Sequence, residues 1–360
     1  MAIKTLKIKD LRNIKEASFS DLNQINVIFG KNASGKTSVL EAIYLLGLAK
    51  SFRSQSHIAL INRDAEELVI HATLQDQTGI GVRKTLPSKS LYKINGKPAQ
   101  SAADLAQNLP LQLINSDSFH LLSGGPGLRR SYLDKGVFHV EHGFLPTWRR
   151  AQKALKQRNT MLKRGRISYS ELHPWDVELI ENTEIIHGLR QLYIETLKQE
   201  LSLLTREFAN FGEALTIDYF AGWDQVNMSF EEALERAFRR DSVSGFSTVG
   251  PHRADIKIKI GGFPAIDVLS RGQQKTLVAM MQVAQGTGVY RATGQKPVFL
   301  VDDIGAELDA ANGVKLLSML ADTGLQLFIT AINPQDANLE GLSVNNPGWF
   351  HVEHGRVARV

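Results

Sequence analysis

QINVIFGKNASGKTSVLEAIYLLGLA, residues 24–49, is the stretch that decides the fold of this chain. Its beginning, INVIF, is a mostly apolar run, which predicts a buried strand. Its end has apolar residues at helical spacing, namely Val39, Leu40, Ile43 and Leu46. Between them GKNASGKT, Gly30–Thr37, fits the phosphate-loop pattern G-x-x-x-x-G-K-[ST]. A strand, a glycine-rich loop and a helix in this order indicate an α/β nucleotide-binding fold.

The phosphate loop predicts the first set of ligand-binding residues. Glycines allow backbone N–H groups to surround a phosphate, and the N-terminus of the following helix adds a favourable dipole. We expect Lys36 to reach the β- and γ-phosphates of ATP and to act in catalysis, and Thr37 to bind Mg²⁺. The predicted nucleotide-binding residues of the loop are Gly30, Lys31, Asn32, Ala33, Ser34, Gly35, Lys36 and Thr37.

An acidic pair follows a second apolar run, PVFLVDD, at residues 297–303. In open α/β sheets ligands bind at the carboxyl ends of the strands, where this run places the two carboxylates. Asp302 is expected to hold Mg²⁺, usually through water, and Asp303 to polarise the attacking water. A solvated strand end is the alternative for such a pair alone, but the phosphate loop favours the catalytic interpretation.

LSRGQ, residues 269–273, opens a further helical pattern. The simplest interpretation is an N-capped helix with Ser270 as the cap. Together with the two earlier motifs, however, it resembles the signature of ABC-type ATPases. That resemblance implies that Ser270, Gly272 and Gln273 bind the γ-phosphate of ATP held by a second subunit, and that Asp309 belongs to a loop facing the dimer.

A closer resemblance extends along nearly the whole chain. The segments that carry it, beside the motifs above, are LRNI (11–14), SFR (51–53), LRRSYLD (128–134) and GPHRADI (250–256). In this order they resemble the RecF family of bacterial recombination mediators. The resemblance implies a head related to SMC proteins, slow ATP hydrolysis stimulated by DNA, and an ATP-dependent homodimer. It also places Arg12 and Asn13 near the base or ribose. Thr330 falls where related ATPases carry a switch histidine, and we expect it to act in catalysis by a hydrogen bond to the γ-phosphate.

The expected architecture is an ABC-type P-loop ATPase head with an inserted helical arm. The head combines a mixed sheet, flanking helices and a β-meander, and we assign it residues 1–124 and 241–360. The arm, residues 125–240, begins with a basic amphipathic pattern and continues in a longer helical pattern from Asp176 to about residue 211.

Positive charge is concentrated at the start of the arm. The net charge of the whole chain is +5, yet eight basic residues and no acid fall within one segment. They are Arg149, Arg150, Lys153, Lys156, Arg158, Lys163, Arg164 and Arg166. We predict that they contact DNA phosphates, the alternative being a merely solvated helix face.

Composition excludes some classes of function. The chain has no cysteine, which excludes disulfides, thiolate metal sites and cysteine nucleophiles. The resemblance to the RecF family implies double-stranded DNA, single-strand/double-strand junctions and RecR as partners, with RecO and RecA in the same pathway. We expect a nucleoid-associated protein of the bacterial cytoplasm with no membrane partner. The alternatives are the ATPase subunit of an ABC transporter, another chromosome-associated ABC-type ATPase, or a small-molecule P-loop kinase.

Overall fold

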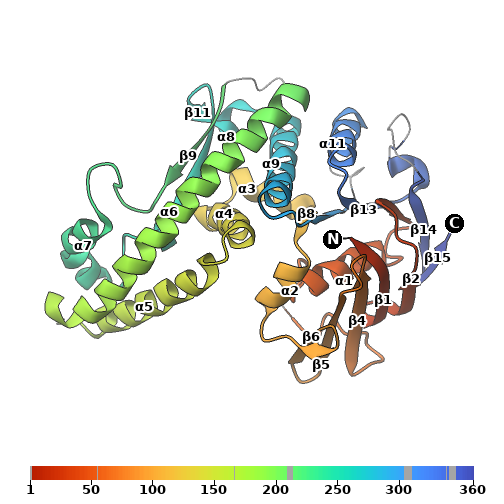
Figure 1. Ribbon diagram of the computed structural model, residues 1–360, viewed down its shortest axis with the longest axis horizontal. Coiled ribbons are helices and arrows are strands. Elements are labelled where there is room, and N and C mark those ends of the chain that lie inside the picture. Colours follow the sequence, from red (N-terminus) through yellow and green to blue (C-terminus); the bar gives the residue numbers. More distant parts are fainter. Residues whose placement is uncertain are drawn as a thin grey trace. The chain divides into compact units, whose positions relative to one another are not determined.

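The computed structural model describes residues 2–54, 56–165, 167–208, 214–303, 310–337, 339 and 346–360. Contacts divide the chain into two units. Unit 1 comprises Met1–Phe119 and Arg271–Val360, and unit 2 comprises His120–Ser270. Figure 1 shows the helices and strands of both. Among the described residues, no helix is both long enough and apolar enough to cross a membrane.

Unit 1 contains two sheets. The first has the order β15-β14-β3-β13-β12-β8, with all pairs parallel except β14–β15. Its strands are β3 (Ile25–Phe29), β8 (Leu111–Ile114), β12 (Val298–Val301), β13 (Gln326–Ala331), β14 (Gly348–Glu353) and β15 (Arg356–Arg359). The two apolar runs found in the sequence form β3 and β12, and β13 lies between them at the centre of the sheet. Because these three strands are parallel, their carboxyl ends meet at one edge.

The second sheet of unit 1 is antiparallel, in the order β2-β1-β4-β5-β6-β7. Its strands are β1 (Ile3–Leu11), β2 (Ile14–Phe19), β4 (Glu67–Leu74), β5 (Gly79–Thr85), β6 (Lys89–Ile94) and β7 (Lys97–Pro98). This is the expected meander, and its tight turn is at Asn95-Gly96, where both residues have positive φ.

Helix α1 (Lys36–Leu48) follows the phosphate loop and contacts strands of both sheets. Ten of its 13 residues are buried, so it lies within the core of the unit. The other helices among the described residues of unit 1 are α2 (Ala102–Asn108), η1 (Ser116–Phe119), α9 (Arg271–Thr293), α11 (Ala310–Asp322) and η4 (Pro334–Ala337).

Unit 2 is mainly helical. Its helices are α3 (His120–Ser123), α4 (Pro126–Val140), α5 (Phe144–Arg164), α6 (Tyr169–Phe208), α7 (Phe230–Ser244), η3 (Pro251–Arg253) and α8 (Ala265–Val268). Helix α6, expected from Asp176, begins seven residues earlier. The reason is a cap: Glu171 accepts a hydrogen bond of 2.8 Å from the backbone N–H of Ser168, so the helix is already formed when the chain reaches Pro174.

A small sheet explains why the unit boundaries differ from the expected ones. It has the order β11-β10-β9, with β9 (Leu215–Phe220), β10 (Asp255–Ile260) and β11 (Phe263–Pro264). We assigned residues 241–270 to the head because of the strand pattern in β10. In the structure β10 pairs with β9 along six residue pairs, so this segment groups with the helices.

Candidate nucleotide-binding site

The phosphate loop runs from the end of β3 to the start of α1, at the edge where the parallel strands end. The Gly30 N–H donates to the carbonyl groups of Ala331 and Ile332, at 3.3 and 3.2 Å. Gly30 has φ 153°, and a Cβ there would lie 2.2 Å from the Val352 carbonyl oxygen. Only glycine therefore fits at the first position of the loop.

The side chain of Lys36, near the C-terminal end of the phosphate loop, lies back over that loop. Its ammonium donates to the carbonyl oxygens of Gly30 at 2.6 Å and Lys31 at 3.1 Å. An ammonium has three N–H donors, so one remains for a ligand. Burial lowers the pKa of Lys36, while the nearby carboxylates of Asp303 and Asp302 oppose that shift. The side chain is thus held at the loop as a partly desolvated cation.

Three side chains from three separate segments meet at Asp302, just beyond β12. The Thr37 hydroxyl donates to Asp302 Oδ1 at 3.0 Å, and the Thr330 hydroxyl donates to the same oxygen at 2.8 Å. Thr330 also accepts the backbone N–H of Asp303 at 2.8 Å. A hydroxyl has a single proton to donate, so in this arrangement Thr330 holds Asp302. Its expected bond to a γ-phosphate remains a prediction.

The electrostatics of the acidic pair follow from burial. Desolvation raises the pKa of Asp302, and the neighbouring Asp303 carboxylate raises it further. The hydrogen bonds from Thr330 and Thr37 act in the opposite direction. Asp303 has φ 50°, a left-handed conformation that is uncommon outside glycine but that aspartate adopts more often than most residues. A partly buried carboxylate whose ionised form is disfavoured is well suited to accept a cation.

Glu41 on α1 is a fully buried carboxylate that the sequence motifs did not predict. Arg12 donates to it from Nε at 2.9 Å and from Nη2 at 2.8 Å. Arg53 Nη1 lies 3.7 Å from Glu41 Oε2. The sequence carries a signal for it, since Glu41 is the only charged residue between Lys36 and Lys50. Asn13 lies beside the loop, where its Nδ2 donates to the carbonyl of Ala33 at 3.1 Å.

These groups surround a cavity of about 470 Å³ within unit 1. It is lined by Arg12, Asn13, Asn32, Ala33, Gly35, Lys36, Thr37, Ser38, Arg53, Asp303 and Thr330. Most of the residues predicted from the phosphate loop and the acidic pair are thus brought together, with Arg53 and Ser38 as additions. Cations, hydroxyl groups and the Asp303 carboxylate facing one cavity are suited to a phosphorylated ligand with a metal ion.

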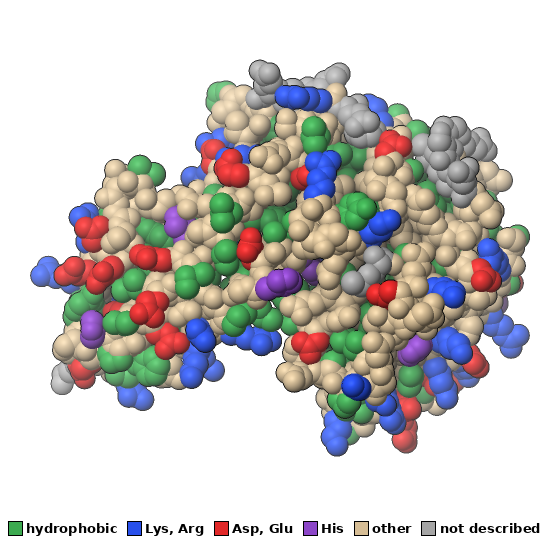
Figure 2. Space-filling model, viewed as in Figure 1, with side chains coloured by type: hydrophobic (Ala, Val, Ile, Leu, Met, Phe, Trp, Pro, Cys, Tyr) green, Lys and Arg blue, Asp and Glu red, His purple; other side chains and the backbone are tan. Residues whose placement is uncertain are grey.

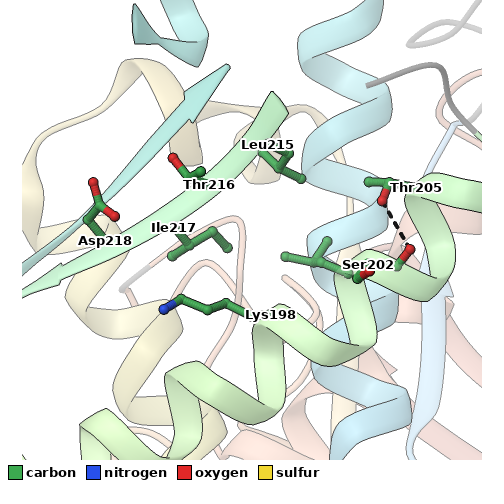
Figure 3. A pocket seen from close by; sticks show the side chains of 8 residues that line it. Lys198, Ser202, Thr205, Leu215, Thr216, Ile217 and Asp218 are labelled. Atoms are coloured by element: carbon green, nitrogen blue, oxygen red, sulfur yellow. Dashed lines mark hydrogen bonds between the residues drawn. The ribbon is translucent and has the colours of Figure 1, made fainter. Parts of the chain in front are cut away.

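Unit 2 has a cavity of about 400 Å³ between α6 and β9, but its chemistry is different. Figure 3 shows Lys198 and Asp218 on its walls together with apolar and hydroxyl side chains. Both charges already have ion-pair partners, Glu195 at 2.7 Å for Lys198 and Lys259 at 2.8 Å for Asp218. This cavity lacks a glycine-rich loop, so we place the candidate site in unit 1.

Comparisons with known proteins agree with this site. The family described as RecF/RecN/SMC N terminal domain matches residues 2–347. The chain is 40% identical to the DNA replication and repair protein RecF of Pseudomonas paraeruginosa, across 100% of this chain and 98% of that protein. The RecF of Shewanella piezotolerans is also 40% identical, across 100% of both. The chain belongs to the RecF family.

Solved structures agree with the RecF assignment. A structure of the recombination mediator RecF-ATP in the RecFOR pathway has a TM-score of 0.87 and 26% identity, covering 100% of this chain and 97% of that one. A RecF-ATPrS structure has a TM-score of 0.86 and 27% identity, with 99% and 98% covered. A structure of an Smc head bound to a ScpA domain has a TM-score of 0.57 and 15% identity, and it shows the same fold. The predicted ABC-type ATPase fold is confirmed, and membership of RecF disfavours the transporter and kinase alternatives.

The signature motif of this RecF protein lies where α9 begins. Ser270 is exposed and immediately precedes the helix, at the N-cap position that the simpler interpretation expects, and Gly272 and Gln273 are in the first turn. Its proposed action on the ATP of a second subunit stays a prediction. Asp309 lies outside the described residues.

The basic segment forms most of α5, and six of its eight basic residues are exposed. These six, which we call the α5 basic face, are Arg149, Arg150, Lys153, Lys156, Lys163 and Arg164. At about 100° per residue they fall within about 140° of one side of the helix. Figure 2 shows Lys and Arg side chains along the lower edge of unit 2, where Figure 1 places α5.

Arg158 is a correction to the predicted DNA-binding set. It follows Arg149 by nine residues, which places it about 180° away on the opposite side of the helix. There it is fully buried, with Nε 2.7 Å from Asp176 and Nη1 2.7 Å from Asp241. Arg158 therefore cannot present its charge to DNA in this structure. Arg166 lies outside the described residues.

Proposed function

We propose that this chain is an ATP-dependent DNA-binding protein of recombinational repair and replication-fork maintenance. It binds DNA at single-strand gaps and junctions as an ATP-induced homodimer and hydrolyses ATP slowly. The observation that supports ATP binding best is the pair of hydrogen bonds from Thr37 and Thr330 to Asp302 beside the phosphate loop. Relatives with full-length similarity include RecF structures described with ATP and ATPrS.

The residues present fit ATP with Mg²⁺. The hydroxyl of Thr37 and the carboxylate of Asp302 lie 3.0 Å apart, and both supply the oxygen ligands that Mg²⁺ prefers. When bound, Mg²⁺ would offset negative charge on the phosphates. Lys36 would direct its remaining N–H to the β- and γ-phosphates, and the loop N–H groups would surround them.

Hydrolysis would depend on Asp303. Its carboxylate lines the cavity that contains Lys36 and Thr37, so it can orient a water molecule toward the γ-phosphate and accept its proton. Thr330 holds the Asp303 backbone N–H and Asp302 at once, which keeps the two acids in a defined arrangement. Asp303 is one methylene shorter than the glutamate usual in ABC-type ATPases, which suits a slow switch.

Dimer closure would use the signature motif. Ser270, Gly272 and Gln273 of one copy would bind the γ-phosphate held by the other, and Asp309 would face the partner. ATP would then hold two heads together, and hydrolysis would release them. The α5 basic face would contact DNA phosphates without reading the sequence, because its lysine and arginine side chains offer charge alone.

In the cell this switch would act in the cytoplasm, in association with the nucleoid. It would cooperate with RecR, and with RecO in loading RecA onto single-strand gaps. The solved relatives are described as part of the RecFOR pathway, which supports these partners.

ATP hydrolysis tests the proposal. The wild type should release phosphate slowly and faster when gapped DNA is added. Asp303→Asn should retain ATP binding but lose about 10²- to 10⁴-fold in rate, the usual contribution of a general base. Glu353→Gln, a change of one carboxylate at the end of β14, should leave the rate unchanged. An Asp303→Asn variant with full activity would exclude this role for Asp303.

A further inference from the structure

We propose that Glu41 is a positioning residue of the nucleotide site, which holds the guanidinium groups of Arg12 and Arg53 at the cavity wall. The inference rests on the proposed ATP binding in the same cavity. Glu41 does not line the cavity itself, whereas Arg12 and Arg53 both do. Any effect of Glu41 on a nucleotide must therefore pass through the side chains that it holds.

The contact with Arg12 is the firm half of this arrangement. Two parallel N–H groups of Arg12 meet the two oxygens of Glu41 at 2.8 and 2.9 Å, and Arg12 Nη1 also donates to the carbonyl oxygen of Ala59 at 2.5 Å. Bidentate pairing fixes the plane of the guanidinium as well as its position. Glu41 lies one helical turn after Thr37 on α1, so Arg12 is tied to the helix that carries the metal-binding hydroxyl.

The contact with Arg53 is looser and acts through two routes. Arg53 Nη1 is 3.7 Å from Glu41, and 45% of the Arg53 side chain is exposed. The second route is Ser51, whose hydroxyl donates to Glu41 and accepts the backbone N–H groups of Arg53 at 2.9 Å and Ser54 at 3.0 Å. Glu41 thus anchors both the side chain of Arg53 and the turn that carries it.

The charges of this cluster allow a positioning role of Glu41 to be distinguished from a purely electrostatic one. One buried carboxylate faces two guanidinium groups, so the cluster has a surplus of one positive charge beside Lys36. The same carboxylate is itself a negative charge near the proposed triphosphate. By its field alone, removing it should strengthen ATP binding. If Glu41 acts by positioning, removing it should weaken ATP binding, because the guanidinium groups are no longer preorganised. The two explanations therefore predict opposite signs.

The test is the dissociation constant of ATPγS with Mg²⁺, measured by calorimetry on the full chain. Glu41→Gln keeps the side-chain volume and removes the charge, and we expect binding about tenfold weaker. The same change in an Arg12→Ala/Arg53→Ala background should no longer weaken binding, because the positioned groups are gone and only the field of the carboxylate remains. Glu16→Gln, an exposed acid on β2, is the matched control and should bind as the wild type does.

Ser51→Ala covers the case in which Glu41→Gln does not fold. It leaves the carboxylate and Arg12 in place and removes only the tether to the Arg53 turn, so binding should weaken by about two- to fivefold. Thermal unfolding of each variant verifies that it is folded at the temperature of the titration.

Three results would overturn the inference. Unchanged or tighter ATPγS binding by Glu41→Gln would show that Glu41 acts on the nucleotide only through the field of its carboxylate. An equal loss in the wild-type and double-alanine backgrounds would show general damage to the fold. Failure of the wild type itself to bind ATPγS, or equal binding by Lys36→Met, would remove the proposed function, a failure distinguishable from the first two.

Discussion

Units 1 and 2 each contain a cluster in which arginine meets buried carboxylate, and the clusters differ in their access to a cavity. In unit 1, Glu41 is buried but Arg53 is 45% exposed and, with Arg12, lines the phosphate-loop cavity. In unit 2, Arg158 and its partners Asp176 and Asp241 have exposed side-chain fractions of 0 to 2%.

The difference separates two uses of the same chemistry. The unit 2 cluster joins α5, α6 and α7, and Arg158 also donates to Ser247 at 2.7 Å. Two carboxylates for one guanidinium leave no surplus positive charge, so this cluster fixes the packing of helices and offers nothing to an anion. The unit 1 cluster has the opposite balance and an open side. We therefore expect mutations in the unit 2 cluster to change stability, and mutations in the unit 1 cluster to change ligand affinity.

The largest expected effect is that of Arg158→Met. It leaves Asp176 and Asp241 buried without their cation, which should lower the free energy of unfolding by about 3–5 kcal/mol. Denaturant unfolding followed by tryptophan fluorescence measures this, since Trp148, Trp175 and Trp223 all belong to unit 2.

Lys156→Met on the same helix is the control for Arg158→Met, because Lys156 is exposed. It should change stability by less than about 0.5 kcal/mol. In the folded Arg158→Met protein, ATP affinity should remain that of the wild type. Equal free energies of unfolding for Arg158→Met and Lys156→Met would contradict the conclusion that the buried unit 2 cluster stabilises the packing of the helices.

A smaller effect is expected from acid, through His252 next to the same cluster. Its ring nitrogen Nε2 lies 2.9 Å from the Ser247 carbonyl oxygen. Burial lowers the pKa of His252 from 6.5 to about 4, with further lowering by Arg253 and Arg130 against the opposing Ser247 bond and Asp241 charge. Because the pKa of His252 is lower in the folded than in the unfolded state, the neutral ring contributes its full stabilisation above pH 6.5. As the pH falls from 6.5 toward 4, the unfolded state binds the proton first, and the free energy of unfolding decreases by about 1.4 kcal/mol per pH unit.

The measurement is the free energy of unfolding between pH 7 and 4. His252→Gln should flatten this dependence without abolishing it, because burial also lowers the pKa of His139 on α4 to about 3. The same pH dependence in His252→Gln and wild type would show that protonation of His252 does not contribute to the loss of stability in acid.

The smallest effect is expected on DNA binding by the α5 basic face. Like Arg53 of the unit 1 cluster its side chains are exposed, but they lie on the surface of a helix and not at the wall of the phosphate-loop cavity. Lys153→Gln/Lys156→Gln should weaken DNA binding and reduce the slope of log K against log salt by about 1–2. Lys198→Gln, an exposed lysine of α6, is the matched control. A slope that does not change in the double variant would remove α5 from the DNA contact.

The sequence predicted the elements of the nucleotide site better than their contacts. The phosphate loop and the acidic strand end are local patterns, so periodicity and glycine spacing were sufficient to find them. The bond between Thr330 and Asp302 depends on the register of β12 and β13, which pairs Val301 with Ile329. No local pattern fixes that register.

The missed features are of two kinds. The pairing of β10 with β9 joins residues 35 or more positions apart in the chain, which hydrophobic pattern alone cannot assign. Arg158 and Glu41, by contrast, carried local signals. A helical wheel places Arg158 opposite the other basic residues, and Glu41 interrupts an apolar helix that is buried nearly all round.

The central claim is that the unit 1 cavity holds ATP and that a second copy closes over it through Ser270. Light scattering with ATP and Mg²⁺ on a hydrolysis-deficient Asp303→Asn background tests this most directly. The account predicts a dimer with ATP and a monomer without it, and a monomer in both conditions once Lys36→Met or Ser270→Arg is added. A protein that stays monomeric with ATP, or a Ser270→Arg variant that dimerises as well as its parent, would contradict it.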